Sequence, residues 1–294
     1  RRWGHDVQYN PGAQLDPSQM GGGGRGRGGT IAVGGGASIL IMILALLFGF
    51  NPGDLLGGGA APAPGQTDNS QYAHCQTGAD IEKDPECRYV AYTNSIQNFW
   101  SQTLSGYQPT KTVTFEGAVN TACGQASAQV GPFYCPADAT VYLDKSFFQT
   151  MLPQLGAQGG DAAEAYVIAH EYGHHIQNLT GIMGKVQQQG QTAGANSPAV
   201  RLELQADCYA GAWLRYASGS ADSIISEVTQ DDLDRAVNAA EVVGDDHIQH
   251  MQAGRVDPSQ WTHGSSQMRK EWLAQGFNSG DPNTCNTFAA GALD

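Results

Sequence analysis

The sequence predicts an α+β protein, mainly helical with a small sheet, built around a helix that carries a metal-binding motif. Three observations support this prediction. The motif His170-Glu171-Tyr172-Gly173-His174 follows a helix-forming run at residues 165–169. A second helix, with two acidic residues four positions apart, is expected to begin near residue 198. The segments at 112–115 and 140–143 have the composition of short strands, which indicates a sheet of modest size.

The first helix is expected to begin at Asp161, because Glu164 follows it three residues later in the pattern of a helix N-cap. Residues four apart on a helix lie about 40° apart around its axis, so His170 and His174 can hold one metal ion from a single face. Glu171 flanks that ion without binding it, where it can act as general base on a water activated by zinc. The alternative is an ordinary amphipathic helix with two surface histidines.

A third ligand is needed, because a tetrahedral catalytic zinc ion takes three protein ligands and leaves one position open. The metzincin pattern is excluded, since it requires glycine and histidine where this chain has Gln177 and Thr180. The helix that Asn196-Ser197-Pro198 opens carries Glu203, which we assign to the metal, and Asp207, which would orient a ligand histidine. Two alternatives remain open: the reverse assignment with Asp207 on the metal, and a solvated acidic helix face.

Four segments resemble the bacterial putative neutral zinc metallopeptidase family: HEYGHHIQ (170–177), RLELQADCYAGAW (201–213), GPFYCPAD with VYLD (131–144), and THGSSQMR (262–269). The similarity extends from about residue 70 to the C-terminus. The combination of HExxH and ExxxD also resembles the ligand set of gluzincins. The resemblance implies a zincin-like fold, one zinc ion held by His170, His174 and Glu203, Glu171 as the base, and a peptide or protein substrate.

The expected reaction is hydrolysis of a peptide bond, in which Glu171 takes a proton from water and delivers it to the leaving amine. The negative charge that develops on oxygen needs a donor besides zinc, and His263 is the first choice, followed by Arg269 and Tyr209. Residues 141–143 either pair with an extended substrate or lie inside the sheet. Two other functions remain open: a membrane-tethered zinc-binding module without turnover, and a zinc hydrolase of a non-peptide envelope component.

Further helices are expected around this core. Asp84-Pro85 opens a helix that extends to about residue 104. Thr229-Gln-Asp-Asp232 has the pattern of a capping box, and Gly244 is expected to interrupt the helix that follows it. A last helix is expected from Ser265 to Gln275, with Gly276 as its end.

The N-terminal quarter is expected to have three parts before a metallopeptidase domain at residues 72–294. Residues 1–30 are Gly-rich and expected to be disordered. Residues 31–50 are expected to form one transmembrane helix, because residues 28–53 contain no charge. Residues 51–71 have the composition of a flexible linker. Arg25 and Arg27 would keep the N-terminus in the cytoplasm and place the domain outside a bacterial cell membrane, with a cleaved signal peptide as the alternative.

Charge and cysteines narrow the function further. Four of the 15 basic and two of the 28 acidic residues lie in residues 1–30, so the remainder has a net charge of −15, which disfavours nucleic acid as a partner. Six cysteines follow the apolar stretch, and an even number in an exported domain indicates disulfides. Of 15 possible pairings, we favour 75–87, 123–135 and 208–285, because the first two close short loops. The sequence does not indicate an oligomeric state.

Overall fold

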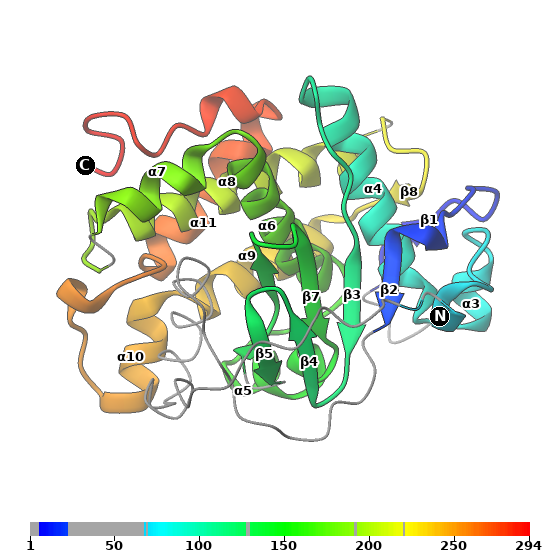
Figure 1. Ribbon diagram of the computed structural model, residues 1–294, viewed down its shortest axis with the longest axis horizontal. Coiled ribbons are helices and arrows are strands. Elements are labelled where there is room, and N and C mark those ends of the chain that lie inside the picture. The colour runs from blue at the N-terminus through cyan, green and yellow to red at the C-terminus, as the bar shows by residue number, and fades with distance from the viewer. Residues whose placement is uncertain (1–5, 23–67, 69, 128–129, 191–192, 220) are drawn as a thin grey trace.

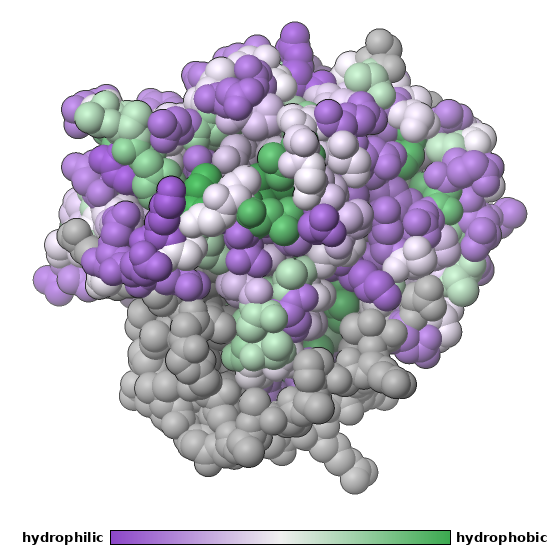
Figure 2. All heavy atoms as spheres, turned by 45° about the horizontal axis from the view of Figure 1, so that its top comes forward, coloured by the Kyte–Doolittle hydropathy of each residue, from purple (hydrophilic) through white to green (hydrophobic). Residues whose placement is uncertain are grey.

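The computed structural model describes residues 6–22, 68, 70–127, 130–190, 193–219 and 221–294 (Figure 1). Long helices and a four-stranded sheet form one packed unit in this part of the chain, and the helices predominate. The predicted α+β class, mainly helical with a small sheet, is therefore confirmed. On the face drawn in Figure 2 the described residues are mostly hydrophilic and apolar areas are limited in extent, as expected when most large apolar side chains lie in the core.

The main sheet has the strand order β2-β3-β7-β6, formed by Met20–Gly22, Thr112–Phe115, Thr140–Asp144 and Phe133–Cys135. Strands β2, β3 and β7 are parallel, and β6 is antiparallel to β7. Both predicted strands are present. Because β7 has a neighbour on each side, residues 141–143 lie inside the sheet, and the hypothesis that they pair with a substrate is wrong. Among the described strands, β6 is the edge strand on that side.

The two faces of the sheet differ, as the two-residue periodicity of a strand requires. On β3, Val113 and Phe115 pack in an apolar cluster with the short hairpin of β4 (Ala118–Thr121) and β5 (Gly124–Ser127). Thr112 faces the helices, where its hydroxyl hydrogen-bonds that of Tyr172, 2.9 Å away. Thr114 does the same with Tyr72 at 2.6 Å. Polar strand residues can therefore be buried, because each hydroxyl has a partner.

The helix that carries the HExxH motif, α6 (Asp161–Leu179), is buried over almost its whole length. It packs against the sheet and against the other long helices (Figure 1). These are α4 (Cys87–Thr103), α8 (Pro198–Ser218), α9 (Gln230–Val242) and α11 (Ser266–Ser279). The shorter elements are α3 (Asp80–Lys83), α5 (Leu152–Gln154), α7 (Ile182–Gln189), α10 (Asp245–Ala253), β1 (Gln8–Tyr9) and β8 (Ile225–Glu227).

Several predicted helix ends are confirmed. Ser197 caps α8 by accepting a hydrogen bond from the backbone of Val200, with a proline at the first helical position. Thr229 and Asp232 form the reciprocal capping box of α9. Gly244 separates α9 from α10 as expected. Local side-chain chemistry determines these ends, which is why the sequence predicts them.

Two predicted helix ends are wrong. Gly160 is the N-cap of α6, and Asp161 is the first helical residue; its carboxylate accepts a hydrogen bond from the Tyr9 hydroxyl at 2.8 Å instead of capping the helix. Gly276 does not end α11, which continues to Ser279 before Gly280 adopts a left-handed conformation. Gly276 is glycine for another reason, namely its contact with α8.

Helices α8 and α11 cross at a distance that only glycine permits. A Cβ atom on Gly276 would lie 1.8 Å from the carbonyl oxygen of Cys208, and one on Gly211 would lie 2.1 Å from that of Leu273. Neither backbone oxygen can move away without disturbing its own helix. The close approach brings α11 against the acidic residues of α8, which matters for the metal centre.

The N-terminal prediction needs correction, because residues 6–22 are folded against the rest of the chain. Strand β1 pairs with β8, and β2 extends the main sheet beside β3, with Met20 completely buried. The expectation of disorder over residues 1–30 is therefore wrong for residues 6–22. A bilayer cannot separate paired strands, so residues 6–22 and residues 72–294 do not fit the expected topology, in which they lie on opposite sides of a membrane.

The expected transmembrane helix at residues 31–50 lies outside the described residues, as does most of the linker at 51–71. Among the helices that the structure describes, none is both long and apolar enough to cross a bilayer.

The six cysteines form the three favoured disulfides: Cys75–Cys87, Cys123–Cys135 and Cys208–Cys285. The first joins the segment that receives residues 11–15 to the start of α4. The second joins the β4–β5 hairpin to β6, and the third fastens the C-terminal segment to α8. The long third loop closes 77 residues and should restrict the unfolded chain most.

The helix crossing gives a testable prediction. Gly276→Ala should lower the free energy of unfolding by at least about 3 kcal/mol, because the new methyl group overlaps the Cys208 carbonyl. Gly184→Ala on α7 is the matched control: a Cβ there meets no atom within 4 Å, so it should change stability by no more than about 1 kcal/mol. Denaturant unfolding at fixed zinc concentration measures both. Equal effects of the two substitutions would refute the proposed role of Gly276.

Candidate metal centre

Three metal-donor atoms converge where α6 packs on α8. The four-residue spacing places His170 and His174 on one face of α6, and Glu203 faces them from α8. The Nε2 atoms of both histidines lie 2.9 Å from the same carboxylate oxygen, Oε2 of Glu203. All three side chains are buried. Two nitrogens and one carboxylate oxygen are a common donor set for catalytic zinc.

The outer nitrogens of both histidines have partners that fix the ring orientation. Nδ1 of His170 donates a hydrogen bond to Oδ1 of Asp207 at 2.8 Å. Nδ1 of His174 donates to Oε1 of Gln177 at 2.8 Å, while the amide nitrogen of Gln177 donates to the carbonyl of Leu202, so its oxygen is the acceptor. With the proton on Nδ1, each Nε2 can present a lone pair toward Glu203. The residues therefore fit a zinc ion held by these three side chains.

Asp207 is fully buried and its oxygens are saturated with hydrogen bonds. Arg269 donates to Oδ2 at 2.8 Å and to Oδ1 at 3.1 Å, and Tyr166 donates to Oδ1 at 2.5 Å. Burial alone would raise the pKa of Asp207, but Arg269 and His170 lower it to about 2. Because these partners already occupy both oxygens, the alternative assignment of Asp207 to the metal does not fit the geometry.

The metal-free centre is electrostatically coupled. Burial favours neutral His170, but the Asp207 and Glu203 carboxylates outweigh it and raise the pKa of His170 to about 10. The pKa of His174 is also raised, by Glu203, against the effect of burial. The pKa of Glu203 is held well below its usual value by His174 and His263, although burial opposes this. The three donors are therefore arranged for a positive charge between them.

Glu171 and His263 line the same cavity as the three donors. Burial raises the pKa of Glu171 above its usual value, although His174 and His170 oppose the change. Nε2 of His263 lies 3.4 Å from Oε1 of Glu203. The structure thus brings together all six residues singled out in the sequence: His170, Glu171, His174, Glu203, Asp207 and His263.

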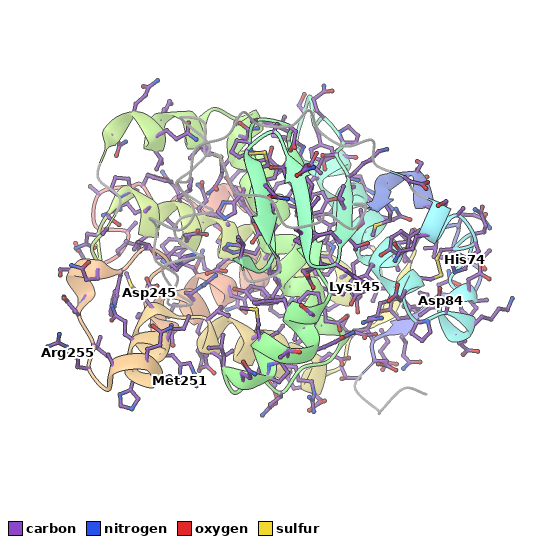
Figure 3. All side chains as sticks on the ribbon, turned by 60° about the horizontal axis from the view of Figure 1, so that its bottom comes forward. His74, Asp84, Lys145, Asp245, Met251 and Arg255 are labelled. Carbon is purple, nitrogen blue, oxygen red and sulfur yellow. A yellow bond between two sulfur atoms is a disulfide. The ribbon has the colours of Figure 1, made fainter. Side chains whose placement is uncertain are left out.

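Asp245, which the sequence analysis missed, holds His263 in place. It is the first residue of α10 (Figure 3), and its Oδ2 accepts hydrogen bonds from the backbone amides of Thr262, His263 and Gly264 at 2.7–2.9 Å. Its other oxygen lies 3.6 Å from Nδ1 of His263. The only sequence signal was an acidic residue directly after Gly244 at a helix start, which gives no indication of this distant contact.

The other candidates do other work. Tyr209 packs against Trp100, with ring centres 5.2 Å apart, and does not line the cavity. Arg269 lines the cavity, but its guanidinium is bound to Asp207. His175 accepts from Tyr134 and donates to the carbonyl of Gln108, so it is a packing residue as expected.

A second group of potential ligands is His74 with the sulfurs of Cys75 and Cys87. Because these two sulfurs are bonded to each other, the group is not a metal site in this structure.

Fold and site together define a single metal centre of the HExxH type, with a carboxylate ligand from a second helix. The family described as putative neutral zinc metallopeptidase matches residues 10–288, and the chain belongs to this family. The match begins within the folded N-terminal segment, which agrees with the packing of that segment onto the domain. Membership supports a zinc-dependent peptidase at the level of the family.

Curated relatives cover much of the chain. The uncharacterized protein Mb2605 of Mycobacterium bovis is 46% identical over 259 residues, which are 85% of this chain and 86% of that protein. The uncharacterized protein Rv2575 of Mycobacterium tuberculosis has the same identity and coverage. The uncharacterized protein YpfJ of Escherichia coli K12 is 49% identical over 185 residues, 62% of each chain. No solved structure matches this chain.

The raised pKa of His170 gives a prediction for zinc affinity. Zinc must displace the proton that His170 carries below pH 10, so affinity should rise with pH. For one displaced proton the gain is about tenfold per pH unit, or about 100-fold from roughly pH 6.5 to 8.5. Competition with a chromogenic chelator measures this dependence. An affinity that does not change with pH would contradict it.

Asp207→Asn should weaken zinc binding by about 10- to 100-fold and reduce its pH dependence, because His170 loses the charge that raises its pKa. Asp234→Asn, an exposed change on α9, is the control and should leave both unchanged.

Proposed function

We propose that this protein is a zinc-dependent metalloendopeptidase. The observation that carries the proposal is the preformed set of His170, His174 and Glu203 with a fourth acidic residue, Glu171, beside it in the same cavity. A site that only binds zinc has no need of that acid. Its presence favours turnover over a membrane-tethered zinc-binding module.

Each residue has a chemical role in the proposed reaction. Zinc, when bound, supplies a Lewis acid that polarises the substrate carbonyl and activates water. Glu171 accepts the proton of the attacking water at its carboxylate and passes it to the leaving nitrogen, which changes from an amide to an amine. Its burial, which raises its pKa, suits a group that must both take and give a proton. His263 donates a hydrogen bond to the developing oxyanion, and Asp245 holds the backbone of His263.

The surroundings of the site support a peptide substrate. Residues Pro132, Phe133 and Tyr134, at β6, line the cavity. No described strand pairs with the outer edge of β6, so an extended peptide can add to the sheet there. The cavity has a volume of about 60 Å³, which is small for a sugar ring. This favours peptide hydrolysis over hydrolysis of a carbohydrate component of the envelope.

We also infer that the domain works outside the cytoplasm, attached to the cell membrane. The three disulfides support an oxidising compartment, and the uncharged stretch at 28–53 supports membrane attachment. Because residues 6–22 pair with the domain, they share its compartment. Cleavage of intact cells by an added protease tests the location: a domain that only lysis exposes would contradict it.

Glu171→Gln tests the assigned reaction. The variant should keep about one zinc ion per chain, because Glu171 is not among the three donors, and should lose at least about 100-fold in kcat, because it cannot take the proton. Metal analysis and mass spectrometry of a digested peptide library measure both. Loss of zinc in this variant would mean that Glu171 is a ligand, and full activity would mean that it is not the base.

His263→Ala should lower kcat by about 100- to 1,000-fold with little change in KM, since the lost hydrogen bond forms mainly in the transition state. Zinc content should be unchanged. His250→Ala, an exposed histidine on α10, is the control and should have wild-type kinetics. An equal rise in KM with unchanged kcat would assign His263 to substrate binding instead.

A further inference from the structure

One wall of the metal cavity is apolar. It is formed by five side chains from separate elements: Pro132, Phe133, Phe147, Val167 and Val243. Phe133 belongs to β6, Val167 to α6, and Val243 ends α9. The catalytic chemistry proposed above uses none of them. A wall of this kind beside a reacting centre needs an occupant, because apolar surface in contact with water is unfavourable.

The apolar wall is continuous with the reacting groups. Val167 lies three residues before His170 and four before Glu171, so all three are on the same side of α6. Val167 keeps 8% of its surface exposed, in an otherwise closed stretch of the helix. Whatever fills the space beside Val167 is therefore held directly next to the proposed base and the first ligand.

The polar groups near this wall are already engaged. Arg269 is bound to Asp207, and the Tyr166 hydroxyl donates to the same carboxylate. The Tyr134 hydroxyl donates to His175 and accepts from Asn178. A charged or hydroxylated group placed against the wall would lose water and find these partners occupied, which is costly. An apolar group loses nothing there.

The volume limits the size of the occupant. A cavity of about 60 Å³ corresponds to roughly four to six water positions. The four carbon atoms of a leucine side chain match this space, whereas an aromatic side chain has too many atoms. Phe147 is held on the other side by Gly131, whose missing Cβ leaves 3.3 Å to the ring, so the wall cannot easily retreat.

We propose that this wall is a specificity subsite that takes an aliphatic side chain adjacent to the cleaved bond, so that the substrates are peptides with leucine, isoleucine, valine or methionine at that position. This inference rests on the proposed peptidase function. It names the substrate class, which the ligand set alone does not determine.

The test uses the zinc-loaded full chain and a set of peptides with one backbone and a single varied residue beside the cleaved bond. The wild type should have a kcat/KM at least about tenfold higher for leucine than for phenylalanine, and higher still relative to lysine or aspartate. Val167→Ala should enlarge the subsite and raise the phenylalanine-to-leucine ratio. Val167→Ile should shrink it and shift the preference toward valine and alanine. Val256→Ala, an exposed valine, should leave every ratio unchanged.

Binding gives a second measurement that does not need turnover. Zinc-loaded Glu171→Gln should bind the leucine peptide more tightly than the lysine peptide, as measured by fluorescence anisotropy. Cleavage by the wild type without aliphatic preference, or with ratios that neither Val167 variant changes, would overturn the subsite and leave the peptidase intact. Absence of cleavage together with preferential binding of the leucine peptide would support the subsite and contradict the peptidase. Equal binding of both peptides would overturn the subsite whatever the activity.

Discussion

The buried carboxylate of Asp207 is the constraint on which the site and much of the packing depend. A carboxylate removed from water is tolerated only when nearly every lone pair has a partner. Here the partners come from α6, through Tyr166 and His170, and from α11, through Arg269. Separating any of the three helices would leave a charge without compensation. The contacts that allow Asp207 to be buried therefore also fix the ring of the first metal ligand.

The rest of the architecture supports this arrangement. Gly211 and Gly276 allow α11 to approach α8 closely enough for Arg269 to reach Asp207. The second ligand, His174, depends on Gln177, which in turn is bound to Gln205, and Gln205 donates to the carbonyl of Cys285 in the C-terminal segment. The disulfide between Cys208 and Cys285 keeps that segment in place. Residues far from the metal in sequence thus determine the orientation of its ligands.

The sequence predicts those features that depend on local spacing. The i, i+4 pairs on α6 and α8 identify the donors, and the caps at Ser197 and Thr229 follow from side chains bonded to nearby amides. Asp245 could not be predicted, because it binds backbone amides 17–19 residues away that no composition reveals. Residues 6–22 resemble a disordered segment in composition, yet they are held by backbone pairing to β3 and β8. Gly276 resembles a helix end, because the sequence does not show that another helix crosses there.

The most direct test of the account is the position of zinc in crystals of the protein grown with the metal, located by anomalous scattering at the zinc edge. The account predicts one strong peak bonded to Nε2 of His170, Nε2 of His174 and the carboxylate of Glu203, with an open position facing Glu171. A peak bonded to Asp207 would contradict the ligand assignment. A fourth bond to His263 would close the site and contradict a catalytic role, and absence of zinc between the three donors would contradict the account as a whole.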